Sequence, residues 1–131
     1  MSFISKLKIE DDEMNVLDCS FEFSQEADYN GRPAENPRGG QIKLLIESTS
    51  KTEFLDWVIS SDMVKDGSIT FFKRDNMSSL KTLDFKGAYC LYYKEHFNTS
   101  STDPMQTHLV ISAKEIKIKS TTFTNNWPSN S

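Results

Sequence analysis

Two histidines and two cysteines are the side chains best suited to metal binding or nucleophilic chemistry in this chain of 131 residues. His96 and His108 belong to no HExxH motif and have no CxxC pair to complete a zinc ligand set. Cys19 and Cys90 lie far apart within apolar runs. We interpret them as two reduced, buried thiols, with a disulfide between them as the alternative. The sequence therefore predicts no metal site.

Acidic side chains offer a second route to chemistry, and the chain has 19 of them. Asp11, Asp12 and Glu13 are adjacent, but they lack the alternating oxygen ligands, glycine and final glutamate of a calcium loop, so a solvated hairpin turn is the preferred interpretation. No carboxylate pair stands out as a general acid and base. The chain contains no GxSxG or GxxxxGK[ST] motif, and Gly39-Gly40 alone does not cradle a phosphate. We expect no catalytic residue and no cofactor.

Composition describes the protein that carries these residues. With 37% hydrophobic and 26% charged residues, the chain is expected to form one domain over residues 1–131. No apolar run approaches the ~20 residues of a membrane helix, which argues against membrane insertion. The first residues lack the apolar stretch and cleavage site of a secretory signal, so we expect folding in the cytoplasm. A net charge of -4 argues against a nucleic-acid partner.

The spacing of apolar residues predicts a mainly β protein. In the second expected strand, Leu17, Cys19, Phe21 and Phe23 share one face. A bend or bulge is expected near Gly87, in the middle of an unusually long strand. The expected strands are residues 3–10, 14–25, 41–47, 68–75, 80–97 and 105–119, followed by a polar tail from residue 120.

One helix is expected, over about residues 51–61. Ser50 and Glu53 form a capping box before its apolar stripe. About seven strands, with this helix inserted between the third and the fourth, predict an antiparallel two-sheet β-barrel or a sandwich.

Residues 26–40 form the longest irregular segment, which contains two prolines and three glycines. Loops of about 12 or more residues in a compact domain are usually functional or disordered. Because proline removes hydrogen-bond donors and glycine loosens the backbone, this segment is expected to be a loop. We interpret it as a projecting contact arm.

Charge and apolar surface both indicate a partner. Residues 1–38 contain nine acids and four bases, a net charge of -5, whereas the remainder contains ten acids and eleven bases, a net charge of +1. Opposite charge at two ends favours head-to-tail association, with an ordinary solvated surface as the alternative. Several strands are also apolar on both faces, which leaves more apolar surface than one helix covers. The doubled apolar positions are Leu44-Leu45, Phe71-Phe72 and Tyr92-Tyr93.

Several short motifs follow one another along the chain in a recognisable order. They include Phe21-x-Phe23-Ser24-Gln25-Glu26, Gly31-Arg32-Pro33, Arg38-Gly39-Gly40, Asp66-Gly67-Ser68-Ile69, Phe72-Lys73-Arg74-Asp75 and Asn126-Trp127. In this order and spacing, over nearly the whole chain, the sequence resembles the Hcp family, the inner-tube proteins of bacterial type VI secretion systems.

The resemblance implies a two-sheet antiparallel β-barrel with a flanking helix, which assembles into hexameric rings that stack into a hollow tube. The tube carries effectors and is expelled when a contractile sheath contracts. The implied partners are further copies of the chain, the sheath, the spike protein and the effectors of the same system. The protein would be cytoplasmic during assembly and secreted without a signal peptide. The implied ring-ring contact loop is Gly31, Arg32, Pro33, Arg38, Gly39 and Gly40, and Asn126 and Trp127 form a subunit or ring contact.

The sequence departs from the family pattern at Asp11-Asp12, which occupies a hairpin where glycine is common in such proteins. A main tube subunit and a specialised paralogue that binds one effector are both compatible with the resemblance. A small monomeric or dimeric β-barrel that binds a ligand is the alternative function. A small hydrolase is the weakest candidate.

Overall fold

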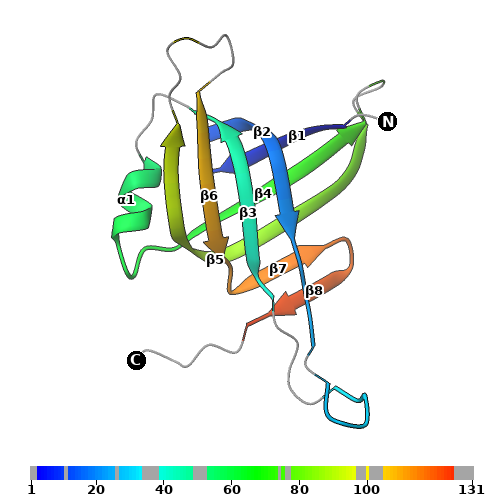
Figure 1. The fold of residues 1–131 in the computed structure, drawn as a ribbon. Helices are drawn as coiled ribbons and strands as arrows, with labels where there is room; N and C mark the ends of the chain where they lie inside the picture. The colour runs from blue at the N-terminus through cyan, green and yellow to red at the C-terminus, as the bar shows by residue number, and fades with distance from the viewer. Residues whose placement is uncertain are drawn as a thin grey trace.

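The computed structural model describes residues 3–10, 12–25, 27–33, 39–48, 53–73, 75, 78–96, 100 and 105–125. These residues form eight strands and one short helix (Figure 1). As predicted, the helix lies between the third and fourth strands. In chain order the elements are β1 (Phe3–Ile9), β2 (Asp12–Phe21), β3 (Gln41–Glu47), α1 (Glu53–Ile59), β4 (Lys65–Lys73), β5 (Ser79–His96), β6 (Gln106–Ser112), β7 (Glu115–Ile118) and β8 (Thr121–Thr124).

Six strands close into an antiparallel barrel in the order β4-β1-β2-β3-β6-β5, because β5 pairs with β4 as well as with β6. The β7–β8 hairpin extends the sheet from β5. Residues 79–88 of β5 pair with β4, and residues 89–96 pair with β6. The strand changes direction at Gly87, whose φ of 61° is a conformation that glycine adopts without steric cost. The predicted β-barrel and the predicted bend are both confirmed.

The core is built from side chains that alternate along the strands and point into the barrel. In β3 and β6 every second residue is buried, as expected for strands with one face on the core. Each buried aliphatic or aromatic side chain contributes roughly 1.5–3 kcal/mol relative to an exposed one. The largest fully buried side chains are Trp57, Phe85, Leu7, Ile42, Ile46, Ile69, Leu83, Leu109, Ile111 and Ile116.

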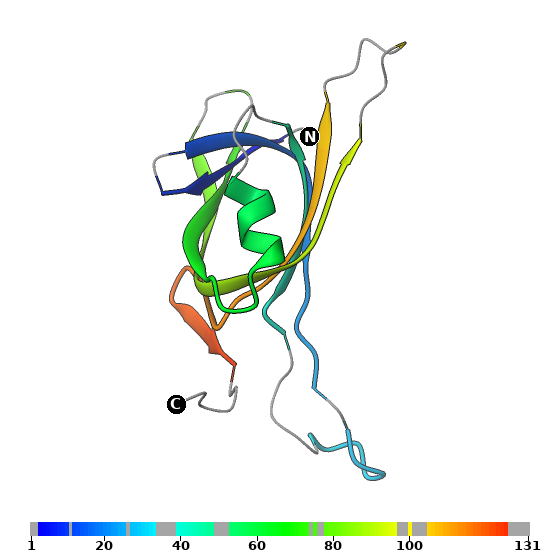
Figure 2. The same ribbon diagram turned by 90° about the vertical axis from the view of Figure 1, so that its left-hand side faces the viewer.

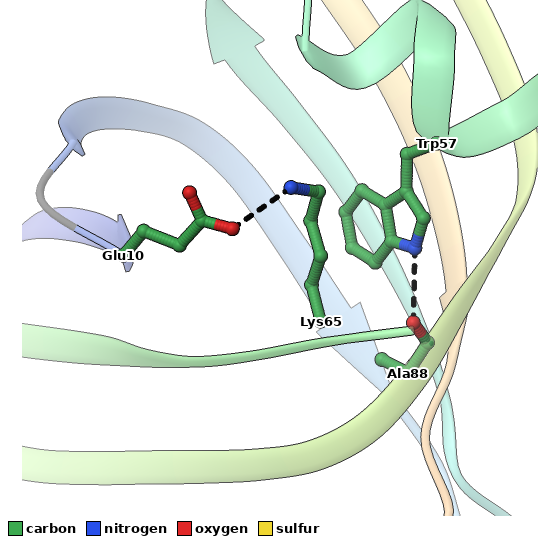
Figure 3. Close-up of polar contacts among 4 residues, drawn as sticks. All are labelled: Glu10, Trp57, Lys65 and Ala88. Atoms are coloured by element: carbon green, nitrogen blue, oxygen red, sulfur yellow. Dashed lines mark hydrogen bonds and ion pairs between the residues drawn. The ribbon is translucent and has the colours of Figure 1, made fainter. Parts of the chain in front are cut away.

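The helix α1 covers one side of the barrel, where it packs against β5 (Figure 2). Phe54 and Trp57, three residues apart, face the core, and the Trp57 Nε1–H donates to the Ala88 carbonyl at 3.0 Å. Beside the indole, the Lys65 ammonium pairs with a Glu10 carboxylate oxygen at 3.0 Å (Figure 3). Glu10, in the β1–β2 turn, has a φ of 57°, a left-handed conformation that is uncommon for residues other than glycine. Asp11, the next residue of this turn, lies outside the described residues.

The helix is shorter than predicted. It ends at Ile59, two residues before the predicted end, and the Ser60 N–H donates to the Trp57 carbonyl at 3.4 Å. Ser50, the expected N-cap, lies outside the described residues.

The single strand predicted over residues 105–119 is wrong. The chain turns between β6 and β7, where the Ala113 N–H donates to the Gly40 carbonyl at 2.7 Å and the Lys114 N–H donates to the Lys86 carbonyl at 3.1 Å. Because Lys114 and Glu115 interrupt the alternation, Ile116 rather than Glu115 is buried after the turn. The segment predicted as a polar tail then forms β8.

The face assigned to Leu17 is also wrong. The register of β2 against β3 shifts between Val16 and Asp18, so Leu17 lies in a bulge with 42% of its surface exposed. The bulge lets Met14 and Val16 before it, and Cys19 after it, pack toward the same core.

Candidate functional site

The predicted arm leaves the barrel after β2 and projects past the β7–β8 hairpin (Figure 1). Its described outer part, residues 27–33, is a turn held by Asp28. The Asp28 N–H donates to the Arg32 carbonyl at 2.7 Å, and its carboxylate accepts the N–H groups of Asn30 at 2.8 Å and Arg32 at 3.0 Å. Gly31, with a φ of 83°, makes the turn possible. The arm therefore presents a preformed turn rather than a loose chain.

The side chains on this turn face solvent. Tyr29 is 97% exposed, and Arg32 and Pro33 are also exposed. Pro33 forms an isolated antiparallel bridge with Ala27, which closes the base of the turn. An exposed aromatic ring beside an exposed guanidinium is a composition enriched in protein–protein contacts.

Gly39 and Gly40, where the arm returns to the barrel, have a packing role. A Cβ on Gly39 would meet the Phe23 ring and would lie 3.2 Å from the Glu22 carbonyl oxygen. A Cβ on Gly40, whose φ is 92°, would meet the Asn125 amide and lie 2.8 Å from the Ala113 carbonyl oxygen. The Asn125 Nδ2 donates to the Ala113 and Gly39 carbonyls, at 2.7 and 3.3 Å.

The predicted contact residues thus divide into two groups. Gly31, Arg32 and Pro33 lie together on the exposed turn, whereas Gly39 and Gly40 fasten the base of the arm. Arg38, Asn126 and Trp127 lie outside the described residues.

A four-stranded sheet beside the arm has two outer edges that no described strand covers. It consists of residues 18–21 of β2, β3, β6 and residues 90–96 of β5, and we call it the open-edged sheet. The strand β1 pairs with β2 only up to Val16, and β4 pairs with β5 only up to Ala88. An uncovered strand edge is a ready template for pairing with another chain.

The outward face of the open-edged sheet carries two rows of side chains that run across the strands. By register, one row contains Asp18, Leu45, His108 and Lys94. The other contains Ser20, Lys43, Val110 and Tyr92, and a shallow depression of about 280 Å³ lies over this face. Asp18 and Lys94, both exposed, stand on the two opposite edges. The sequence did not indicate that Asp18 and Lys94 share one row.

The thiols near this sheet are poorly suited to chemistry. Burial, with a smaller effect from Asp18, raises the pKa of Cys19 to about 11. Burial likewise raises the pKa of Cys90, opposed in part by a hydrogen bond with the Tyr92 backbone. Both thiols are free and stay protonated at neutral pH, so they are weak nucleophiles and poor metal ligands. Within the described ranges, no three His, Cys, Asp or Glu side chains gather into a metal site, and no helix is long and apolar enough to span a membrane.

Comparison with known proteins places these features in a family. Residues 1–128 match the profile of the family described as hemolysin coregulated protein Hcp (TssD). The structure of Hcp1 from Flavobacterium johnsoniae is 38% identical, with 93% of this chain and 99% of that chain covered and a TM-score of 0.85. A comparison with curated proteins finds no match.

Two more distant structures share the fold. Hcp1 from Salmonella typhimurium is 12% identical, with 95% of this chain and 93% of that chain covered and a TM-score of 0.72. The sheath/tube terminator of PVC, an extracellular contractile injection system, is 19% identical, with 88% and 93% covered and a TM-score of 0.54. The same fold therefore occurs in Hcp structures and in a contractile injection system.

Proposed function

This chain belongs to the Hcp (TssD) family of tube proteins, and from that premise we propose that it forms hexameric rings that stack into the inner tube of a type VI secretion system. The tube is assembled in the cytoplasm inside a contractile sheath, below the spike protein. It holds effectors in its lumen and is expelled with them when the sheath contracts.

The observation that carries this proposal is the open-edged sheet. A ring requires head-to-tail contacts, in which one surface of each copy meets a different surface of the next. Pairing of the β2 edge of one copy with the β5 edge of its neighbour satisfies this requirement and covers both edges. The same pairing continues the cross-strand row, so that Asp18 of one copy comes next to Lys94 of the following copy. Opposite charges on neighbouring strands favour that register over its alternatives.

In a continuous ring of such sheets, the face that carries the two rows lines the lumen. The inner face is already occupied by the barrel core, so the outward face is the one available to cargo. It mixes both charges with Leu45, Val110 and Tyr92, a composition that provides weak contacts to many protein surfaces.

The arm supplies the contact between rings in this proposal. It projects beyond the barrel and carries Arg32 on a turn that Asp28 has already ordered, so little conformational entropy is lost on docking. Arg32 and Arg38 would meet carboxylates of the adjacent ring. Asn126 and Trp127 would add a subunit or ring contact.

Charge exchange tests ring formation at the proposed contact between the β2 edge of one copy and the β5 edge of the next, which we call the seam. Asp18→Lys or Lys94→Asp alone places like charges side by side, and we expect fewer rings in negative-stain images and native mass spectra. The double variant restores opposite charges and should restore rings. Arg32→Glu, outside the seam, should keep rings but reduce their stacking.

The controls decide between functions. Circular dichroism must show that every variant is folded, since both seam residues are exposed. A wild-type protein that stays monomeric at micromolar concentration would contradict the ring. It would favour the alternative, a small ligand-binding barrel, for which an apolar cleft of about 640 Å³ beside β7–β8 is the relevant observation. Rings that survive both single charge reversals would refute the seam.

A further inference from the structure

An apolar cleft and an exposed apolar corner lie on different sides of the barrel, and we propose that the corner of one copy docks into the cleft of the next. This inference rests on the proposed ring and adds a second contact to it. The cleft has a volume of about 640 Å³ and opens between the end of β2 and the β7–β8 hairpin. The corner is the surface formed by α1 and the turn that follows it.

The cleft has aromatic walls that are already packed together. The Phe23 and Phe123 rings lie 5.0 Å apart between centroids, and Phe21 packs edge-on against Phe23 at 6.3 Å. The apolar lining of the cleft includes Phe21, Phe23, Ile118 and Phe123, and Lys81 and Lys119 also line it. Gly39 leaves room for the Phe23 ring, because a Cβ at this position would overlap it.

The α1 corner presents apolar side chains that the core does not use. Phe54 and Trp57 bury the inner side of the helix. Leu55 and Ile59, four residues apart on the same side of the helix, are 47% and 74% exposed. Val64, at the end of the following turn, is 47% exposed. Ile59 in particular stands out as a projecting side chain of the kind that fills a cleft.

Charge distinguishes this pairing from a merely apolar contact. Asp56 and Asp62 are exposed next to Leu55 and Ile59 on the corner. On the cleft side Lys81 and Lys119 are exposed, and within the described part of the chain neither forms an ion pair. The apolar corner with its acidic neighbours therefore complements the apolar cleft with its basic neighbours.

The position of the two surfaces agrees with the seam. In Figure 1, α1 lies on one side of the barrel and the β7–β8 hairpin lies toward the other. The cleft includes Phe21, which directly continues the β2 edge, and the corner is joined to the start of the open β5 edge by the Trp57–Ala88 hydrogen bond. One neighbour can therefore contact the β2 edge and the cleft together. A small apolar ligand would occupy the cleft but would leave the exposed corner unexplained.

Two variants test the docking. Ile59→Glu adds a charge to the corner. We expect the protein concentration needed for ring formation to rise by about tenfold or more, because a central interface contact is lost. Met105→Glu is the matched control, because Met105 is an apolar residue with 46% exposure outside both surfaces. It should leave that concentration unchanged.

Disulfide trapping tests proximity directly. In the double variant Ile59→Cys and Ser120→Cys, mild oxidation of assembled rings should link neighbouring copies into a ladder up to the ring size. Each single variant should stay unlinked, which controls for Cys19 and Cys90. Normal ring formation by the Ile59→Glu variant, together with no ladder from the double cysteine variant, would overturn the docking while leaving the ring intact.

The absence of ring formation is distinguishable from the absence of docking. If the wild-type protein forms no rings, the proposed function and the docking both fail. If assembled wild-type rings bind the apolar dye anilinonaphthalene sulfonate as well as the single Asp18→Lys variant does in its monomeric form, the cleft stays open in the ring. A small ligand would then be its occupant, and the docking would be wrong.

Discussion

Gly31 and Gly40 provide a matched test of how the arm is fastened to the barrel. Both have a positive φ, 83° and 92°, so alanine is strained at either position. Their surroundings differ completely. A Cβ on Gly31 would meet nothing within 4 Å, whereas a Cβ on Gly40 would meet the Asn125 amide and lie 2.8 Å from the Ala113 carbonyl oxygen. The same substitution therefore separates backbone strain from packing.

The expected magnitudes follow from these contacts. The positive φ costs an alanine about 1–2 kcal/mol, and about 0.5 kcal/mol returns because the unfolded chain is stiffer, which leaves about 1 kcal/mol for Gly31→Ala. In Gly40→Ala the new methyl group also displaces the Asn125 side chain. That side chain donates two hydrogen bonds, to Ala113 and Gly39, each worth about 1 kcal/mol. We expect Gly40→Ala to lower the free energy of unfolding by about 3 kcal/mol.

Urea titration of both variants at one protein concentration measures the difference. With a slope of about 2 kcal/mol per molar urea, a difference of about 2 kcal/mol separates the two midpoints by about 1 M. Equal midpoints would show that Asn125 does not fasten the base of the arm. A Gly31→Ala variant with the lower midpoint would reverse the assignment, because the exposed turn would then contribute more than the buried base.

Two further predictions concern buried groups. Trp57→Phe keeps an aromatic ring but removes the donor to the buried Ala88 carbonyl, so the free energy of unfolding should fall by about 1–3 kcal/mol in urea titration, while Met105→Ala at an exposed site should change it by less than about 0.5 kcal/mol. An equal effect of both would contradict the role of this hydrogen bond. Because the pKa of Cys19 is raised from 9.0 to about 11, its contribution to stability is complete below about pH 9 and is lost as the pH rises toward 11. Cys19→Ala should reduce this pH dependence, to which Cys90 also contributes because its pKa is likewise raised. The Cys19 thiol of the native protein at pH 8 should react with iodoacetamide about 100-fold more slowly than in denaturant, as followed by mass spectrometry. Equally fast labelling would refute the assignment.

Features that depend on neighbouring residues in the chain could be predicted from the sequence. Alternation identified most of the strands, and Gly87 indicated the bend in β5, because backbone preference and side-chain period are local properties. The arm was equally visible, since proline and glycine exclude regular strands wherever they cluster.

Features that depend on distant partners could not be predicted. The bulge at Leu17 arises from the register of β2 against β3, and the turn after β6 arises from hydrogen bonds to Gly40 and Lys86. The open-edged sheet is defined by where β1 and β4 stop pairing, which no single segment reveals. The packing of Gly40 against Asn125 joins positions 85 residues apart in sequence, so Gly40 appeared only as part of a loop motif.

The bend in β5 also has a mechanical consequence. One strand of 18 residues joins the open-edged sheet to the rest of the barrel, because residues 79–88 pair with β4 and residues 89–96 pair with β6. A force applied to the open-edged sheet therefore reaches β4 along a covalent chain, without passing only through packed side chains. The open-edged sheet cannot slide past β4 unless the hydrogen bonds of β5 break, so the barrel bears load as one unit.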